Sequence, residues 1–278
     1  MKCIFHRIDF DGMCSGAIVK HFHPDCEMIG INHGEPFPWE ILEENEQIFM
    51  VDFSLPIEDM KRLNNFCMLT WIDHHDTAIR AAHEAGFLTN AGMSLNNSKA
   101  ACELTWEWFY PTEKMPLGVF LLGRWDVWDH AADPDTEKYQ YGMRTYPDTH
   151  PDNQEFWKDI FSGIKDVDIV IKGNLILIYE NKQNAMFAES HYFLTDIDGY
   201  MAIALNKGMT NSKAFDSVYD ENDHDLMLTF VRTPKKQWRI SMYTTNKDVH
   251  VGNIAKKFGG GGHPGAAGFI CETLPFDI

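Results

Sequence analysis

Short apolar runs alternate with segments of helical periodicity in the first half of the chain. Three apolar runs have the length and composition of buried strands, at residues 3–8, 47–53 and 66–72. Three further segments carry apolar residues at helical spacing, at residues 11–22, 56–66 and 97–110. Strand–helix alternation of this kind predicts an α/β domain with a doubly wound parallel sheet.

The middle of the chain breaks this alternation. Residues 133–152 are rich in Pro, Asp and Thr, which predicts an excursion over the surface. Residues 153–190 look helical throughout, with Leu175, Ile178 and Tyr179 on one face. This second segment therefore predicts a helical connector between two domains, with a boundary near residue 185.

The last ninety residues have strand periodicity followed by a short helical segment. Strand-like runs lie at residues 199–206, 225–232 and 237–244. The turn at Pro234-Lys235-Lys236 predicts a hairpin between the last two runs. The apolar spacing from Val251 to Phe258 is helical and stops at a run of four glycines. We therefore expect a smaller α/β C-terminal domain, and three parts at residues 1–165, 166–190 and 191–278.

Composition and charge narrow the function classes. The 278 residues carry a net charge of −17, and no Lys/Arg run exceeds two residues, so a protein that tracks long nucleic acid is disfavoured. No apolar run approaches the roughly 20 residues of a membrane span, and Asp9 interrupts the N-terminus before a signal-peptide core could form. None of the six cysteines forms a C-x-x-C pair, which predicts reduced thiols. We expect a cytoplasmic protein without a membrane partner.

Ionisable residues gather where apolar runs end. The four groups are His6, Asp9 and Asp11; Asp52; Asp73, His74 and His75; and Asp126 with Asp129. Singly, an Asp after a strand is more often a helix cap or turn residue, and a lone His is more often a core residue. The carboxyl ends of parallel strands, however, meet at one edge of a sheet and form its ligand crevice. The shared position of the four groups therefore favours a common site.

Several carboxylates in one crevice repel one another and require a compensating charge. Asp and His ligands without Cys suit Mn²⁺, with Mg²⁺ or Co²⁺ as alternatives. Two divalent cations would balance four carboxylates, and paired cations of this kind serve phosphoryl displacement. We therefore expect two divalent cations, Mn²⁺ first among them.

Five stretches in order resemble a known family. "HRIDFDG", "VDFS", "IDHH" and "GRWDVW" look like the successive motifs of the DHH phosphoesterase superfamily. "AKKFGGGGHPGAAGF" looks like the glycine-rich motif of the DHH-associated C-terminal domain. The resemblance covers nearly the whole chain. It implies a two-domain, metal-dependent hydrolase with its active site in the cleft between the domains, of the oligoribonuclease or exopolyphosphatase-like kind.

The resemblance also implies roles for single residues. It assigns one cation to His6, Asp9 and Asp52, and the other to Asp11, Asp52, His74 and Asp126, with Asp52 bridging. It places His75 against the scissile phosphate and has Asp73 orient the histidines. Asp126 is preferred over the nearby Asp129 because the family motif has a Trp two residues after its Asp, as Trp128 is here.

The glycine run and the hairpin strand supply the candidate substrate contacts. Glycines leave backbone N–H groups open to a phosphate or ribose, and a flexible linker is disfavoured because a strand follows. The candidates are Gly260, Gly261, Gly262, His263, Arg239 and Tyr243. Family members often have Ser-Leu-Arg where this chain has Ser241-Met242-Tyr243. Strand alternation puts Tyr243 on the face of Arg239, where a phenol offers stacking without charge. The alternative is that Tyr243 packs against an adjoining helix.

These inferences favour a Mn²⁺-dependent phosphodiesterase that converts short oligonucleotides or dinucleotides to mononucleotides by a two-metal mechanism. The first alternative is a phosphoanhydride hydrolase of the exopolyphosphatase or pyrophosphatase type. The second is a non-catalytic nucleotide-binding regulator, which the complete set of expected ligands disfavours. The expected partner is a short nucleotide or phosphate substrate, and a homodimer stays open.

Overall fold

The computed structural model describes residues 1–278 in two compact units. The first unit is Met1–Leu177 and the second is Ile178–Ile278. The division falls within the 26-residue helix α8 (Asp166–His191), which contributes its first half to one unit and its second half to the other.

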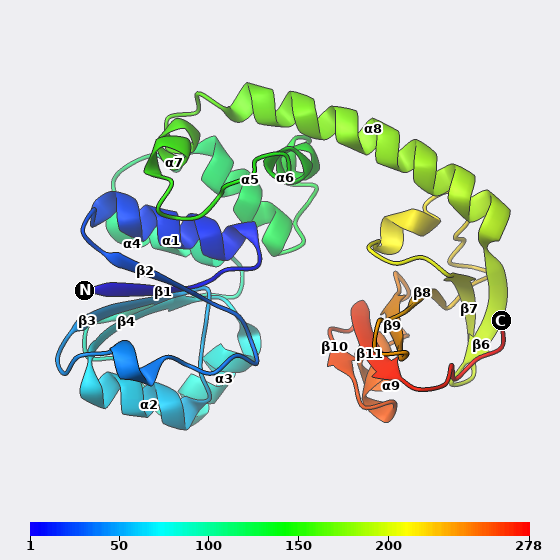
Figure 1. The fold of residues 1–278 in the computed structure, drawn as a ribbon, viewed down its shortest axis with the longest axis horizontal. Coiled ribbons are helices and arrows are strands. Elements are labelled where there is room, and N and C mark those ends of the chain that lie inside the picture. The colour runs from blue at the N-terminus through cyan, green and yellow to red at the C-terminus, as the bar shows by residue number, and fades with distance from the viewer. The chain divides into compact units, whose positions relative to one another are not determined.

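The first unit is built on a five-stranded parallel sheet. In the order β2-β1-β3-β4-β5, its strands are Glu27–Ile31, Lys2–His6, Gln47–Val51, Met68–Asp73 and Met93–Leu95. The helices that alternate with them are α1 (Phe10–Phe22), α2 (Ile57–Phe66), α3 (Asp76–Glu84) and α4 (Ala101–Phe109), with a short 3₁₀ turn at Trp39–Ile41. Figure 1 shows α1 and α4 on one face of the sheet and α2 and α3 on the other. The prediction of a doubly wound parallel sheet is confirmed.

Burial on both faces explains why the strands are apolar throughout. Phe5 points into the core beneath α1 and α4, where it joins Phe49. Its neighbour Ile4 points to the other face and joins Met50 and Trp71 beneath α2. Successive strand residues face opposite sides, so a sheet covered by helices on both sides needs apolar residues at nearly every strand position.

Three more helices complete the first unit and correct two predictions. α5 (Leu117–Asp126), α6 (Thr136–Met143) and α7 (Gln154–Phe161) share one core with α1, α4 and the start of α8. The surface excursion predicted at 133–152 is wrong at α6, whose Tyr139 is fully buried. The single helix predicted over 153–190 is also wrong, because α7 ends at Phe161 and Gly163 takes a left-handed φ of 76° before α8 begins. Glycine adopts that conformation without steric cost.

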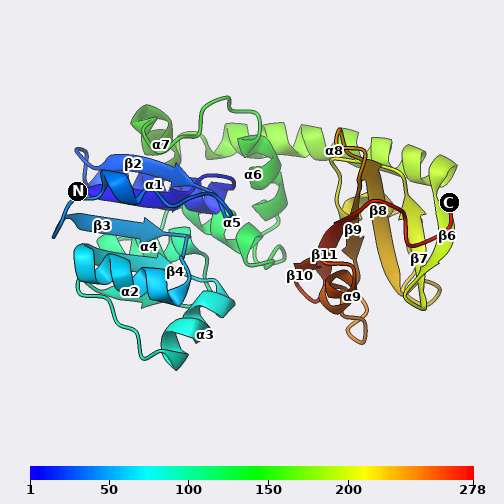
Figure 2. The same ribbon diagram turned by 60° about the horizontal axis from the view of Figure 1, so that its bottom comes forward.

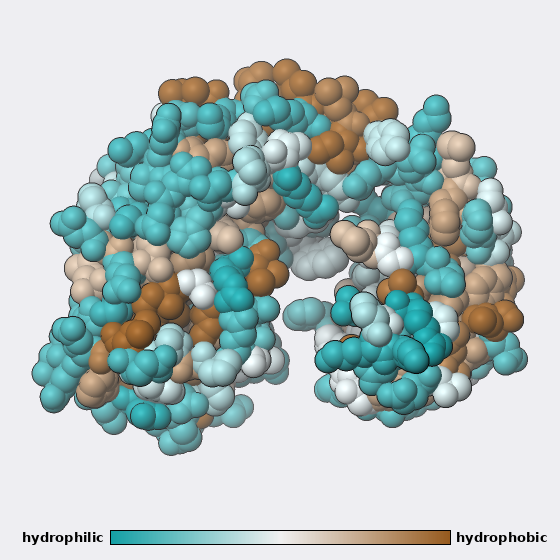
Figure 3. All heavy atoms as spheres, in the orientation of Figure 1, coloured by the Kyte–Doolittle hydropathy of each residue, from teal (hydrophilic) through white to brown (hydrophobic).

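Helix α8 has an exposed apolar face. Figure 3 shows hydrophobic atoms along it, and the large exposed side chains include Val167, Ile171, Leu175, Ile178 and Tyr179. The one-sided pattern read from the sequence is thus present, but its apolar side lies in solvent. No helix in the chain, α8 included, is long and apolar enough to cross a membrane.

The second unit is a six-stranded mixed sheet. In the order β10-β11-β9-β8-β7-β6, its strands are Gly261–Gly262, Ala266–Cys271, Trp238–Tyr243, Leu226–Arg232, Tyr200–Leu205 and Phe193–Ile197. Only β7 and β8 pair in parallel, and the other pairs are antiparallel. α9 (Val251–Lys257) packs against β11, and the 3₁₀ turn Ser212–Phe215 joins a core with the end of α8 (Figure 2). The predicted strands, hairpin and helix are all confirmed.

Candidate metal centre

The carboxyl ends of three adjacent strands bring the predicted ligands together. β2 and β3 flank β1 on opposite sides, so the strand order reverses at β1. His6 is the last residue of β1, Asp52 follows β3 and His74 follows β4. Such a reversal leaves a crevice at the carboxyl edge of an open α/β sheet. The first helix enters it closely, because a Cβ on Gly12 would lie 2.0 Å from the His6 carbonyl oxygen.

His6, Asp9 and Asp52 form the first group of facing ligand atoms. His6 Nδ1 lies 2.8 Å from Asp9 Oδ2 and 3.6 Å from Asp52 Oδ2, yet this buried nitrogen makes no hydrogen bond. On the other side of the ring, Nε2 lies 3.3 Å from Asn32 Oδ1. When Nε2 donates to that amide oxygen, Nδ1 keeps a lone pair directed at two carboxylates. This arrangement fits a cation.

Asp11, His74 and Asp126 form the second group. His74 Nε2 lies 3.2 Å from Asp126 Oδ2, 3.3 Å from Asp52 Oδ1 and 3.5 Å from Asp11 Oδ2. Asp52 therefore presents one oxygen to each group. It is buried and has a φ of 52°, a left-handed conformation that Asp tolerates better than most residues. The backbone after β3 is thus bent to place one carboxylate between two sites.

The close carboxylates of this cluster would be stabilised by positive charge. Burial, followed by the charges of Asp52 and Asp126, raises the pKa of Asp11 well above its usual range. Burial likewise raises the pKa of Asp52 and of Asp126. Burial opposes the charged form of His6, but the close carboxylates of Asp52 and Asp9 raise its pKa to about 10. In the absence of cations the protonated forms of these groups are favoured, and divalent ions would compete with those protons.

Helix α4 fixes Asp11 in the cluster. The backbone N–H groups of Ala101 and Cys102 donate to the two carboxylate oxygens of Asp11 at 2.9 Å and 2.7 Å. These are the unpaired donors of the first helical turn, and they favour negative charge. The two hydrogen bonds therefore fix the orientation of the buried Asp11 carboxylate.

The structure distinguishes Asp126 from Asp129. Asp126 lies against His74, whereas Asp129 is 50% exposed and lies 3.4 Å from the Arg124 guanidinium. Asp126 follows an apolar run, as expected, but that run is helix α5 rather than a strand of the sheet, and Asp126 is its last residue. The C-terminal end of α5 therefore places the Asp126 carboxylate beside His74, at the carboxyl edge of the sheet.

Asp73 holds the histidine pair in place. Its Oδ1 lies 2.6 Å from His75 Nδ1 and accepts the backbone N–H of His74 at 2.7 Å. Trp71 Nε1 lies 3.3 Å from its other oxygen. The hydrogen bond to Asp73 outweighs burial and raises the pKa of His75 to about 9. Asp73 itself is fully buried, so its contacts are confined to the positioning of its neighbours.

Two residues of this site escaped the sequence reasoning. Asn32 orients His6, and the His33 ring stacks on Phe53 with centroids 4.9 Å apart. The His33 ring centroid also lies 5.2 Å from that of His6 and 5.9 Å from that of His75. Both residues follow β2, whose half-exposed sequence Glu27–Ile31 lacks the apolar run that marks the other strands. The sequence signal for both residues is the polar pair itself, at the end of a strand that the apolar pattern does not predict.

In the second unit the glycine run allows close contact with the neighbouring strand, and it leaves the backbone of Gly261 uncovered. A Cβ on Gly260 would lie 2.2 Å from the Gly268 carbonyl oxygen, and Gly262 has a φ of 144°. Gly261 pairs with Gly268, and Gly268 pairs with Ser241 on β9. This row has no side chain larger than Ser over three strands. Two of the three candidate glycines are thus required by packing, and Gly261 has open space above it.

The other candidate contacts differ in exposure. Arg239 and His263 are exposed, and the His263 backbone N–H donates to the Ala266 carbonyl at 2.8 Å. Tyr243 is half-buried in a cluster with Phe187 of α8 and Phe215, and its hydroxyl lies 3.5 Å from the Thr210 carbonyl oxygen. Packing against an adjoining helix, the alternative raised from the sequence, is therefore present at Tyr243.

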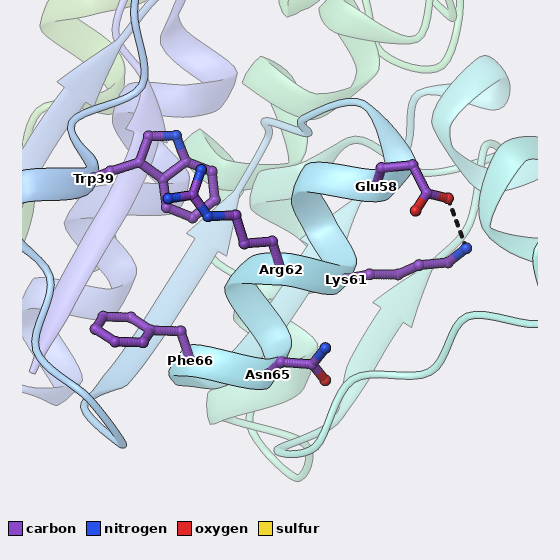
Figure 4. Close-up of a pocket in the computed structure, with 6 residues that line it drawn as sticks. All are labelled: Trp39, Glu58, Lys61, Arg62, Asn65 and Phe66. Atoms are coloured by element: carbon purple, nitrogen blue, oxygen red, sulfur yellow. Dashed lines mark hydrogen bonds and ion pairs between the residues drawn. The ribbon is translucent and has the colours of Figure 1, made fainter.

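A separate hollow lies on α2, away from these ligands. It has a volume of about 660 Å³, and its lining residues are Trp39, Glu58, Lys61, Arg62, Asn65 and Phe66 (Figure 4). The Arg62 guanidinium covers the Trp39 ring at 4.0 Å. None of the metal-ligand candidates lines it.

Comparison with known proteins gives a domain match and one distant curated relative. Residues 201–274 match the DHHA1 domain. An uncharacterized protein of Acanthamoeba polyphaga mimivirus is 26% identical over 263 residues, an alignment that covers 87% of this chain. The same alignment covers 58% of the viral protein, so the chain spans little more than half the length of this relative.

Solved structures share the fold over nearly the whole chain. A pGpG-specific phosphodiesterase from Vibrio cholerae has a TM-score of 0.58 and 13% identity, with 97% of this chain and 92% of that chain covered. The DHH domain of a member of the s1p family of ribosomal proteins has a TM-score of 0.60 and 14% identity, with 97% and 82% covered. An exopolyphosphatase-related protein from Bacteroides fragilis has a TM-score of 0.55 and 14% identity, with 96% and 85% covered. At these identities the likeness shows the fold.

The domain match and the shared fold agree with the five ordered motifs in the sequence. Four of those motifs contain the candidate ligand groups of the first unit, and the fifth contains β10 and most of β11 of the second. The chain carries a DHHA1 domain at residues 201–274 and shares its fold with a solved DHH domain.

Proposed function

We propose that the protein is a metal-dependent phosphodiesterase that hydrolyses short oligonucleotides or dinucleotides to mononucleotides. The observation that carries the proposal is the position of Asp52, with one oxygen toward His6 and the other toward His74. A carboxylate shared by two ligand groups is what a two-cation phosphoryl-transfer site requires. The similar fold of a pGpG-specific phosphodiesterase supports a dinucleotide as the substrate.

The donor set fits two divalent cations. His6, Asp9 and Asp52 would hold one, and Asp11, Asp52, His74 and Asp126 would hold the other. Oxygen and imidazole donors without thiolate favour Mn²⁺, with Mg²⁺ or Co²⁺ as alternatives. When bound, the pair supplies Lewis-acid activation of water and of the phosphoryl group.

The remaining residues of the first unit act on the phosphate directly or through a neighbour. His75 is held by Asp73 through Nδ1, which leaves Nε2 to donate a hydrogen bond to a phosphate oxygen. The negative charge of Asp73 keeps His75 protonated at neutral pH, and a charged donor stabilises the negative charge that grows in the transition state. Asp73 is therefore a positioning residue for His75.

The second unit supplies candidate substrate contacts. We propose that the bare backbone at Gly261, with His263 and Arg239, binds the nucleotide. Replacement of His263 by Ala should lower kcat/KM on dinucleotides and leave the bound manganese unchanged. Loss of manganese from His263→Ala would make His263 a ligand and contradict this assignment.

Purified protein with manganese, assayed on a dinucleotide and on long-chain polyphosphate, tests the proposed function. We expect dinucleotides to be cleaved with the higher kcat/KM, because a chain with a net charge of −17 repels long polyanions. Replacement of Asp52 by Asn should reduce turnover at least about 1000-fold while the fold persists. Efficient polyphosphate hydrolysis with little dinucleotide cleavage would instead favour a phosphoanhydride hydrolase, which the fold shared with an exopolyphosphatase-related protein keeps as the second candidate.

A further inference from the structure

A stack of aromatic rings runs from the core of the first unit to its surface beside Asp126. Tyr141 is buried and meets the edge of Trp125 at 6.2 Å. His130 stacks on Trp125 with centroids 4.2 Å apart and planes within 5°. Trp128 stacks on the same imidazole at 5.4 Å and 21°, so His130 contacts both indoles. Trp128 ends the stack and is 71% exposed.

The turn after α5 holds Trp128 in this exposed position. Its φ is 61°, a left-handed conformation that is uncommon for a bulky residue. The Trp128 backbone N–H donates to the Trp125 carbonyl at 3.1 Å, and that of Asp129 donates to the Arg124 carbonyl at 2.9 Å. The Arg124 side chain forms ion pairs with Glu103 of α4 and with Asp129 of the turn. The ring is therefore fixed before any ligand arrives, which reduces the entropy lost on binding.

Trp128 lies close in the chain to Asp126, a candidate ligand of the metal centre. Only Val127 separates it from Asp126 in the chain, so the Cα atoms of Asp126 and Trp128 lie within roughly 7 Å of each other. Asp126 in turn contacts His74, 3.2 Å away. Ring contacts cover Trp128 only on the side of His130. An aromatic surface thus lies in solvent within the reach of one nucleotide from the ligand cluster.

We propose that Trp128 is the platform on which a nucleobase of the substrate stacks while the adjoining phosphate lies at the metal centre. The inference rests on the proposed function and names the part of the substrate that Trp128 recognises. Every base has a π-face, so stacking on indole is strong and tolerant of base identity. Inorganic phosphate and polyphosphate have no such face. Trp128 therefore selects nucleotides over phosphate chains.

Binding of product fragments to the manganese-loaded full chain tests the platform. Replacement of Trp128 by Ala should raise the Kd of adenosine monophosphate and guanosine monophosphate by about 5- to 150-fold, the range that one stacked base supplies. The Kd of inorganic phosphate should change less than about twofold, because phosphate meets the cations alone. The KM for a dinucleotide should rise by a similar factor as the Kd of a mononucleotide, with kcat largely kept.

Two variants and one comparison keep the test decisive. Trp128→Phe retains a ring and should recover most of the affinity. Trp108→Ala removes a 37%-exposed tryptophan near the far end of α4 from Asp11 and should leave all three constants unchanged. Equal weakening of mononucleotide and phosphate binding in Trp128→Ala, or no weakening of either, would overturn the platform. Failure of the wild type to cleave dinucleotides would overturn the proposed function instead, and the mononucleotide comparison would still decide the role of Trp128.

Discussion

His75 Nδ1 lies 2.6 Å from Oδ1 of Asp73, a carboxylate that is fully buried at the end of β4. The same oxygen accepts the backbone N–H groups of His74 and His75. One buried charge therefore fixes both the backbone and one ring of the histidine pair. Asp73 ends its strand facing the interior, and the two histidines follow with their rings in the crevice.

Replacement of Asp73 by Asn should reduce kcat about 10- to 100-fold while most of the bound manganese is kept. The amide oxygen of Asn can still accept hydrogen bonds from the backbone N–H groups. Because the amide is neutral, it no longer stabilises the protonated imidazole of His75. The pKa of His75, raised to about 9 in the wild type, should fall toward its ordinary value of 6.5. Histidine NMR titration of the metal-free variant measures this shift. An unchanged His75 pKa would show that Asp73 does not set it.

The Asp126 and Asp129 pair gives a matched test of the ligand set. Asp126→Asn removes an oxygen that lies 3.2 Å from His74 Nε2 and should weaken manganese binding at that group at least about tenfold. Asp129→Asn removes an exposed partner of Arg124, and exposed ion pairs contribute little. Calorimetric titration with manganese should therefore separate the two variants. The opposite ranking would move the ligand from Asp126 to Asp129.

The sequence pattern indicates the candidate site residues at the strand ends, because each apolar run there gives way to an ionisable side chain. A strand buried on both faces must be apolar, so His6, Asp52 and Asp73 stand out where the apolar runs end. Asp126 lies at the end of a helix, and its place beside His74 depends on how α5 packs. Its assignment came from the family motif, since helix packing is a tertiary property that spacing does not report.

Two features that the sequence pattern does not predict, the site residues after β2 and the buried helix α6, also depend on tertiary packing. β2 is half-exposed at the sheet edge, so its sequence carried no continuous apolar run and Asn32 and His33 went unplaced. α6 lies in a stretch whose Pro and Asp content is typical of loops, yet tertiary packing buries its Tyr139 completely. The hydroxyl of Tyr139 donates to Asp166 at 2.9 Å, a contact across 27 residues that no local pattern predicts.

Without metal, the protein should lose stability as the pH rises. The folded-state pKa values of His6 and His75 are about 10 and 9, against 6.5 for an exposed histidine. A raised folded pKa adds stability that is complete below about pH 6.5 and is lost as the pH passes through the folded pKa. The free energy of unfolding should therefore fall between about pH 6.5 and pH 10.

Thermal unfolding in a chelator across this pH range measures the effect. His75→Gln should flatten the slope, because the variant lacks one of the two titrating rings. Manganese should reverse the trend, since cations displace the same protons and bind more tightly at higher pH. A metal-free protein whose Tm rises from pH 7 to pH 9 would show that the two histidines are not held in their charged form.

Variants of Tyr243 can distinguish a structural role of this residue from a role in substrate binding. Its ring packs with Phe187 and Phe215, so Tyr243→Ala should lower the free energy of unfolding by about 1–3 kcal/mol. Tyr243→Phe keeps the ring and loses only a long contact of 3.5 Å to the Thr210 carbonyl, so it should be close to the wild type in stability. Denaturant unfolding of the two variants, with KM measured on a dinucleotide, distinguishes the roles. The packing role predicts a stability loss for the Ala variant with no change specific to nucleotide substrates. A rise in KM at unchanged stability would instead support the stacking role that the strand alternation first indicated, and Tyr243 would then join Trp128 as a second surface for a base.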